Sequence, residues 1–121
     1  MSVSLRIAAV VVTHNRAAKL RLTLARLLAE EVDQVLVVDN ASTDQTAEVL
    51  AEISDRRLQV LHLPTNRGGA GGFEAGVAAL HGPSARRPLP DWTVLSDDDA
   101  CPKPGAFAAF RRSAALLDPR R

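Results

Sequence analysis

The chain has 121 residues, which is the usual size of one domain. Apolar residues make up 46% and charged residues 24%, which is the balance of a folded protein and not of a disordered one. The 15 Lys and Arg against 14 Asp and Glu leave a formal charge of +1, and aromatic residues are only 3%. Nucleic-acid-binding domains carry a basic excess or stacking aromatics, so that class is disfavoured. The single Cys101 excludes an internal disulfide and a zinc site built from cysteines.

No stretch of the sequence reaches the roughly 20 apolar residues that a membrane-spanning helix needs. The apolar run at residues 7–12 is far shorter, and no small-residue cleavage pattern follows it. The sequence therefore predicts a cytoplasmic protein, or a peripheral one at the inner face of the membrane.

Short apolar runs alternate with segments of helical periodicity along the whole chain. The runs rich in Val, Ile and Leu cover residues 5–12, 34–38, 58–63 and 92–96. Such runs are typical of strands buried on both faces of a parallel sheet. Helices are expected over residues 16–29, from the cap at Ser42, over 73–80 behind a glycine-rich start, and from Pro104, which suits the first turn of a helix. This alternation predicts an α/β fold, a Rossmann-like parallel sheet of about four strands with about four helices on both faces.

The residue pattern also predicts how the shorter helices are capped and buried. Ser42 and Gln45 have the spacing of a capping box for the second helix. That helix is expected to turn Ala47, Leu50 and Ile53 inward. The last helix is expected to bury a stripe made of Phe107, Phe110, Ala114 and Leu117. The arginines near the C-terminus are predicted to form a solvated basic end: Arg111, Arg112, Arg120 and Arg121.

Polar side chains follow every predicted strand, at the point where the strand ends. In an open parallel sheet the carboxyl ends of the strands share one edge, and ligands bind there. The four clusters are therefore expected to meet: Thr13, His14, Asn15 and Arg16; Asp39, Asn40, Ser42 and Asp44; Asn66 and Arg67; Asp97, Asp98 and Asp99.

The three consecutive aspartates are the sharpest of these features. Adjacent carboxylates repel one another, and a hard divalent cation such as Mn²⁺ or Mg²⁺ relieves that repulsion with oxygen ligands. Alternate residues of an extended segment point to the same side, so Asp97 and Asp99 are expected to share a metal site while Asp98 faces elsewhere. The alternative is a solvated acidic turn that caps the next helix.

Other residues of the same edge keep two interpretations open. Asp39 is either an acceptor for a base N–H or a ribose hydroxyl, or a common turn residue. Arg67 is either a phosphate clamp or a solvated loop charge. Residues 68–72 match neither the dinucleotide fingerprint nor the Walker loop. Their glycines let the backbone approach a diphosphate, or they form a simple junction between loop and helix.

These segments together resemble the nucleotide-binding half of a family 2 glycosyltransferase with the GT-A fold. The resemblance rests on Val-Val-Val-Thr-His-Asn-Arg at 10–16, Val-Val-Asp-Asn-Ala-Ser-Thr-Asp at 37–44 and Asn-Arg-Gly-Gly-Ala-Gly-Gly-Phe at 66–73. The aspartate triplet at 97–99 corresponds to the DxD signature of that family. The glycine-rich segment together with the full triplet most resembles the galactofuranosyl- and rhamnosyltransferase branch.

The resemblance implies a role for each of these residues. Thr13 and Asp39 would hold the uracil and ribose of a nucleotide-sugar donor, with Arg16 or Arg67 nearby. Asp99 would be the main protein ligand of Mn²⁺ or Mg²⁺ at the diphosphate. Asp97 would contact the metal or the ribose, and Asp98 belongs to the same donor-binding group.

The resemblance also implies a reaction, an inverting transfer from a UDP-sugar, or a dTDP-sugar, to a glycan or lipid-linked acceptor in cell-wall polysaccharide biosynthesis. A complete family member continues beyond its aspartates into the acceptor half. Residues 1–121 are therefore predicted to form a single truncated donor-binding domain, with the catalytic base beyond Arg121. An exposed sheet edge is expected to favour self-association. The alternative is a non-catalytic nucleotide-sugar-binding or assembly module.

Overall fold

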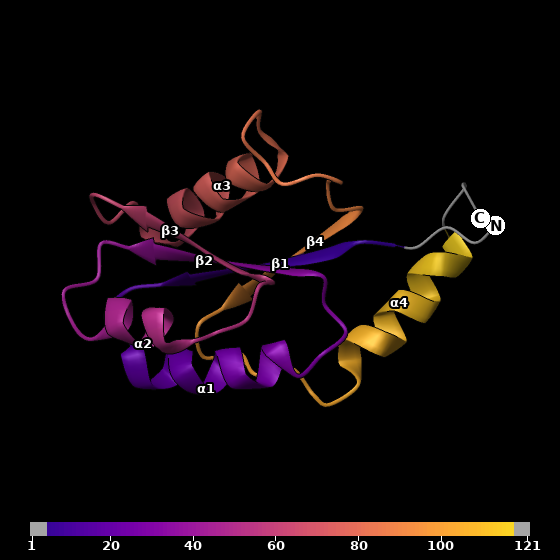
Figure 1. Cartoon of the computed structure of the whole chain (residues 1–121), viewed down its shortest axis with the longest axis horizontal. Helices are drawn as coiled ribbons and strands as arrows, with labels where there is room; N and C mark the ends of the chain where they lie inside the picture. Colours follow the sequence, from indigo (N-terminus) through magenta and orange to yellow (C-terminus); the bar gives the residue numbers. More distant parts are fainter. Residues whose placement is uncertain (1–4, 118–121) are drawn as a thin grey trace.

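Strands and helices alternate along residues 5–117, the part of the chain that this computed structural model describes (Figure 1). The strands are β1 (Ile7–Thr13), β2 (Gln34–Asn40), β3 (Leu58–Leu63) and β4 (Trp92–Asp97). The helices are α1 (Ala17–Leu28), α2 (Thr46–Glu52), α3 (Gly68–His81) and α4 (Ala106–Leu117). The predicted α/β fold with four strands and four helices is confirmed.

All four strands are parallel, in the order β3-β2-β1-β4. The chain first builds outward from β1 to β3 and then returns to place β4 on the other side of β1. This reversal makes a switch point between β1 and β4, where ligands bind in open parallel sheets. The register sets Thr13 beside Asp39 and Val12 beside Asp97, so the carboxyl ends of β1, β2 and β4 lie side by side.

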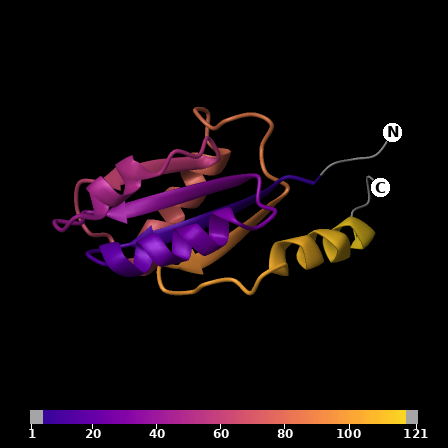
Figure 2. The ribbon, with the colours of Figure 1, turned by 60° about the horizontal axis from the view of Figure 1, so that its bottom comes forward.

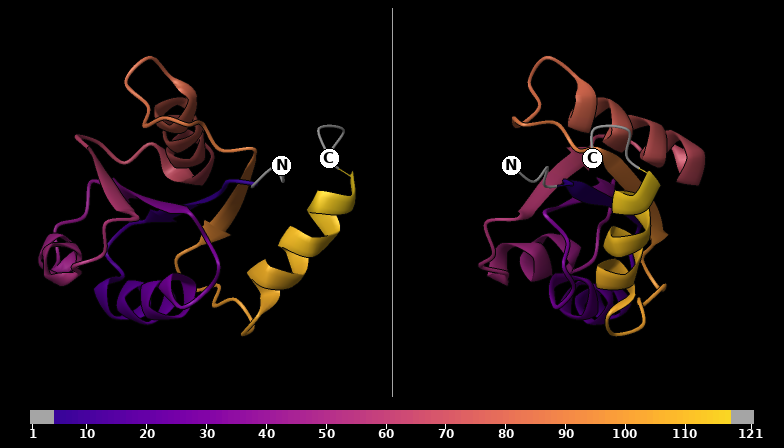
Figure 3. Two further views of the ribbon diagram at one scale, coloured as in Figure 1. Left: turned by 45° about the vertical axis from the view of Figure 1, so that its right-hand side comes forward. Right: turned by 90° about the vertical axis from the view of Figure 1, so that its right-hand side faces the viewer.

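The two central strands are buried on both faces because helices cover them from both sides. Figures 1 and 3 show α3 on one face of the sheet and α1 with α2 on the other. Alternate residues of β1 divide between two apolar clusters. Ile7 and Val11 pack with Leu24 of α1, whereas Val10 packs with Leu80 of α3. The near-continuous Val and Ala content of these strands follows from this double burial.

Helix α3 packs closely on the sheet where its glycines face it. A Cβ atom on Gly72 would lie 2.6 Å from Cγ1 of Val12, and one on Gly76 would lie 2.6 Å from Cγ1 of Val10. The helix begins at Gly68, whose φ of +72° makes the glycine-rich start irregular as predicted, but the helical residues extend back beyond residue 73, where the prediction placed their start. The glycines inside the helix serve its packing, and the first ones face the site described below.

Helix α4 stands apart from the other three, to the side of the sheet beyond β4 (Figure 2). Its first turn is held by Glu30, whose carboxylate accepts hydrogen bonds from the backbone N–H groups of Gly105 (3.1 Å) and Phe107 (3.0 Å). The helix begins at Ala106, so Pro104 precedes it, and the prediction that Pro104 lies in its first turn was wrong.

Part of the predicted pattern of α4 is corrected by its position. Phe107 and Ala114 are buried as expected, but Phe110 is 37% exposed and lies edge-on to Trp92 with ring centroids 5.5 Å apart. Arg111 is not a solvated charge: its guanidinium donates to the carbonyl of Glu31 (2.7 Å), to the carboxylate of Asp33 (2.9 Å) and to the carbonyl of Leu5.

The side chain of Leu117 and the residues beyond it, including Arg120 and Arg121, lie outside the described part. Within residues 5–117, no helix combines the length and apolar character needed to cross a bilayer.

Candidate functional site

A cavity of about 510 Å³ opens at the carboxyl ends of β1 and β4. Its lining combines the end of β1, the aspartates that follow β4 and the beginning of α3. The charged residues in the lining are Arg16, Asp97, Asp98 and Asp99, and the uncharged ones include Thr13, His14, Asn40, Asn66, Gly68 and Gly69. Five residues proposed from the sequence for donor or metal binding thus meet in one cavity at the switch point of the sheet: Thr13, Arg16, Asp97, Asp98 and Asp99.

Asp98 is the fixed member of the aspartate triplet. It is buried, and its Oδ2 atom accepts a hydrogen bond from the hydroxyl of Thr13 (3.0 Å). Its backbone carbonyl accepts from the hydroxyl of Thr23 on α1 (2.6 Å). These bonds hold the turn after β4 against β1 and α1. The hydroxyl proton of Thr13 is thereby committed to Asp98.

Asp97 and Asp99 turn away from this anchor and are exposed at the cavity. Asp98 is thus buried between two exposed neighbours, but all three aspartates line the same cavity, and Asp98 and Asp99 lie in a turn after β4 and not in an extended segment. Arg16 lies across from them: its Nη1 atom is 3.4 Å from Oδ2 of Asp99 and 3.6 Å from Oδ1 of Asp98. The guanidinium compensates part of the negative charge that three adjacent carboxylates bring to the cavity.

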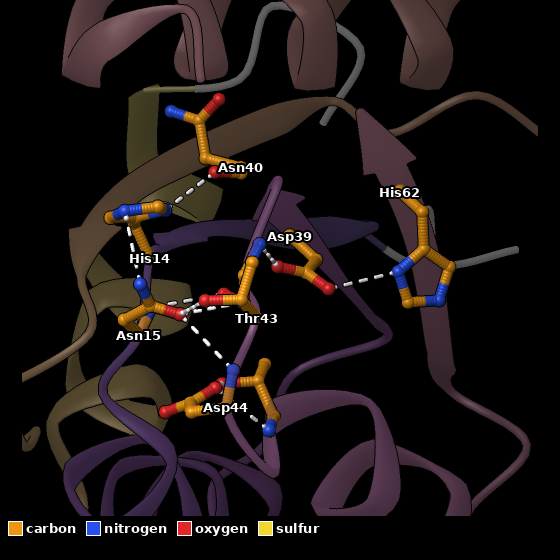
Figure 4. A network of polar contacts seen from close by, with 9 residues as sticks. His14, Asn15, Asp39, Asn40, Thr43, Asp44 and His62 are labelled. Atoms are coloured by element: carbon orange, nitrogen blue, oxygen red, sulfur yellow. Dashed lines mark hydrogen bonds and ion pairs between the residues drawn. The ribbon is translucent and has the colours of Figure 1, made fainter. Parts of the chain in front are cut away.

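The loops after β1 and β2 are locked together by Asn15 (Figure 4). Its Oδ1 atom accepts from the backbone N–H groups of Thr43 (2.7 Å) and Asp44 (3.3 Å), and its own N–H donates to the hydroxyl of Ser42 (2.9 Å). Asn15 has a φ of +51°, a conformation that asparagine adopts more readily than most residues. This left-handed turn places His14 and Arg16 at the cavity.

Asn40 connects β2 to both neighbouring loops. Its side chain donates to the carbonyl of Gly68 (2.9 Å) and accepts from the N–H of Arg67 (2.8 Å), which positions the start of α3. Its carbonyl oxygen lies 2.7 Å from Nδ1 of His14, so this ring nitrogen carries the proton and donates. Sequence reasoning placed Asn40 at the edge but gave it no role; an asparagine at the end of a buried strand was the available signal.

Asp39 lies at the same edge but does not line the cavity. It is buried, with Oδ1 accepting from the N–H of Ser42 (3.0 Å) and Oδ2 lying 2.9 Å from Nδ1 of His62, as Figure 4 shows. The Arg67 side chain also lies outside the cavity, beside the outer part of α3 and β3. The structure thus separates these two residues from the five that meet in the cavity.

The donor set of the cavity fits a hard cation that shares its coordination with a ligand. Within residues 5–117, no group of three or more His, Cys, Asp or Glu side chains forms a complete metal site. Asp97 and Asp99 offer exposed carboxylates, whereas Asp98 is engaged with Thr13. One or two carboxylates completed by phosphate oxygens and water are the usual protein ligands of Mg²⁺ in phosphate-binding sites.

The family model described as glycosyl transferase family 2 matches residues 8–114. The chain belongs to that family. The succinoglycan biosynthesis protein ExoO of Rhizobium meliloti (strain 1021) is 32% identical over 97 residues, which are 78% of this chain and 26% of ExoO. The chain therefore spans about a quarter of the length of this curated relative.

Solved structures show the same fold. A mannosyltransferase of Pyrobaculum calidifontis, in complex with GDP-Man and Mn²⁺, superposes with a TM-score of 0.73 at 24% identity. The match covers 98% of this chain and 34% of the mannosyltransferase. The protein Rv0371c of Mycobacterium tuberculosis H37Rv matches with a TM-score of 0.57 at 19% identity, over 95% of this chain and 61% of that one. The family 2 domain described here therefore shares its sheet and helices with part of a GT-A glycosyltransferase.

Proposed function

We propose that this domain binds the nucleotide-diphosphate sugar donor of an inverting glycosyl transfer, through a divalent cation. The observation that carries the proposal is the cavity at the switch point, where Asp97, Asp99 and Arg16 meet the glycines that begin α3. Membership of family 2 and the fold shared with a mannosyltransferase solved with GDP-Man and Mn²⁺ support it.

The three aspartates, Thr13 and the first glycines of α3 each have a task in the proposed donor binding. Asp97 and Asp99 would hold Mn²⁺ or Mg²⁺, which supplies positive charge for the departing nucleoside diphosphate. Thr13 keeps Asp98 in place, and Asp98 fixes the turn that presents its two neighbours. The exposed backbone of Gly68 and Gly69 leaves space for phosphate oxygens, since a Cβ atom at either glycine would meet nothing within 4 Å.

Asp39 would contribute to donor binding from beside the cavity, whereas the Arg67 side chain would have to turn from the outer face of α3 to reach a phosphate. The Asp39 carboxylate is buried at the end of β2, so a base N–H or ribose hydroxyl reaching it would share it with His62. We favour a UDP-sugar, with a dTDP-sugar as the alternative. The proposed acceptor is a glycan or a lipid-linked sugar in cell-wall polysaccharide synthesis, at the cytoplasmic side of the membrane. Galactofuranosyl or rhamnosyl transfer rests on the sequence of residues 66–73.

The catalytic base defines the competing proposal. In the described part of the chain, the carboxylates that line the cavity are those of the triplet, and each already has a task there. We propose that the base lies beyond Arg121. If no such segment accompanies the domain, it acts as a non-catalytic nucleotide-sugar-binding or assembly module.

The test is calorimetry of UDP, dTDP and GDP binding, each measured with Mn²⁺ and with EDTA. We expect a nucleoside diphosphate to bind in Mn²⁺ and to lose about tenfold or more in affinity in EDTA, because the diphosphate then lacks the cation that compensates its charge beside the aspartates. Asp99→Asn should remove the Mn²⁺ dependence. Glu52→Gln is the matched control, since it removes an exposed carboxylate that pairs with Arg21 on the outside of α1. Equal binding in Mn²⁺ and EDTA would contradict the role given to the aspartates.

A further inference from the structure

Arg16 lies where a cation is needed to balance the aspartates. Its Nη1 atom lies 3.4 Å from the Asp99 carboxylate and 3.6 Å from that of Asp98. Within residues 5–117, Arg16 is the only basic side chain that forms an ion pair with the triplet. The proposed function places a metal ion next to Asp99. In this structure the Arg16 guanidinium contacts that carboxylate.

The two contacts of Arg16 differ in how easily they can be exchanged. Asp98 is held in place independently of Arg16, through Thr13 and through Thr23. The contact with Asp99 joins two side chains that are 50% and 48% exposed, at a distance long for a charged hydrogen bond. An exposed ion pair of this kind adds little to stability, so Arg16 can leave Asp99 without disturbing the fold.

A divalent cation and the Arg16 guanidinium compete for the same carboxylate. Both are positive, and at contact distance from one oxygen they repel each other strongly in a partly enclosed cavity. A cation that arrives alone must therefore detach Arg16 and leave its charge without a partner. A nucleoside diphosphate changes this balance, because it brings new anionic oxygens for which a planar guanidinium is well suited.

We propose that Arg16 keeps free divalent cations away from Asp99 and moves from this carboxylate to the diphosphate when donor and metal bind together. Metal and diphosphate then each strengthen the binding of the other, because each relieves the charge that the other leaves unpaired. This inference rests on the proposed function, since it takes the cavity to be the diphosphate site. It explains the coupled binding of metal and diphosphate by one side chain, that of Arg16 at the start of α1.

The test measures Mn²⁺ binding to the whole chain by calorimetry, first without nucleotide and then with UDP. Arg16→Gln should bind Mn²⁺ alone about tenfold more tightly and bind UDP in Mn²⁺ about tenfold more weakly, so that, at an unchanged UDP affinity in EDTA, the coupling factor falls about tenfold. Arg16→Lys keeps the charge and should still disfavour Mn²⁺ alone, but it lacks the planar fork for phosphate.

Arg21→Gln is the matched control, because it removes the same charge from the same helix outside the cavity. It should change neither affinity by more than about twofold, since a distant surface charge is screened by salt. If Arg16→Gln binds Mn²⁺ alone no more tightly than the unchanged chain does, the inference is overturned, including the case in which neither binds. UDP binding that depends on Mn²⁺ would in that case leave the proposed function standing. Failure of the unchanged chain to bind any nucleoside diphosphate overturns the proposed function itself, and the inference with it.

Discussion

Asp44 holds the first turns of two helices with one carboxylate. Its Oδ2 atom accepts from the N–H of Ala17 in α1 (3.2 Å), and Oδ1 accepts from the N–H (3.0 Å) and the hydroxyl (2.5 Å) of Thr46 in α2. The Thr46 hydroxyl is the largest cause that holds the pKa of Asp44 below its ordinary value, because these bonds favour the charged form. The capping box predicted from Ser42 and Gln45 was wrong: Gln45 is the N-cap residue but makes no side-chain cap, and Ser42 instead accepts from Asn15.

Asp55 and Arg57 give a pH-dependent contribution to stability. The Arg57 side chain donates a hydrogen bond to the Asp55 carboxylate and lowers the pKa of that carboxyl from 3.8 to about 2. The same guanidinium also donates to the backbone carbonyls of Leu28, at the end of α1, and of Val32, which follows that helix. A lowered carboxyl pKa stabilises the fold above the unfolded value and loses this effect as pH falls through the folded one. Asp55→Asn should therefore cost about 1 kcal/mol near neutral pH, reduced by solvent screening. Between pH 3.8 and about 2 the cost should shrink towards zero.

Urea unfolding at a series of pH values measures this difference. Glu52→Gln serves as the control, because the Glu52 carboxylate forms an exposed pair with Arg21. A cost of Asp55→Asn that stays constant from neutral pH down to pH 2 would show that the carboxylate charge is not the cause.

At the scale of elements, α3 packs on the sheet through Gly72 and Gly76. A methyl group at either position would meet a valine of β1 and push the helix away from the sheet. Gly76→Ala brings a Cβ to within 2.6 Å of Val10, a stiff branched side chain in the core of β1. We expect it to lower the free energy of unfolding by about 1–3 kcal/mol, the usual cost of overpacking. Gly69→Ala, in the same helix with open space around it, should be neutral or raise stability by up to about 1 kcal/mol through helix propensity. Chemical denaturation of both variants checks this, and equal effects would contradict the close-packing account.

The strands could be predicted from the sequence more closely than the helices because burial dictates their composition. The run at residues 58–63 is observed without change as β3, and β2 extends the predicted run by Asp39 and Asn40. Helix α3 was shortened in the prediction because glycine disfavours helices locally, whereas here its close packing on β1 and β2 outweighs that preference. In α2, Ala47 is exposed and Val49 is buried instead, since the helix starts later than the predicted cap implied.

At the scale of the whole molecule, topology explains why much of the site could be predicted. Parallel strands bring their carboxyl ends to one edge, so Thr13 and the aspartates could be placed together without coordinates. The sequence could not show that the side chains of Asp39 and Arg67 lie outside the cavity, because this depends on partners from other elements. Asp39 is turned to His62 of β3. The backbone of Arg67 is fixed by Asn40, while its side chain points to the outer face of α3.

The uneven cover of the sheet also leads to a prediction about assembly. Within residues 5–117, β4 pairs only with β1, and its outer edge presents backbone groups that a further strand could bind. Leu95 is 53% exposed because it shares the face of Val10, where α3 packs over β1 and β2 and leaves β4 uncovered (Figure 3).

We expect the chain to self-associate through the outer edge of β4 at micromolar concentrations. Leu95→Lys should shift the chain towards monomer, because a charged edge residue disfavours strand pairing. Analytical ultracentrifugation over a concentration series measures this, with Leu22→Lys as control, since Leu22 is equally exposed (55%) but lies on α1. A monomeric unchanged chain, or an equal shift in both variants, would contradict assembly through β4.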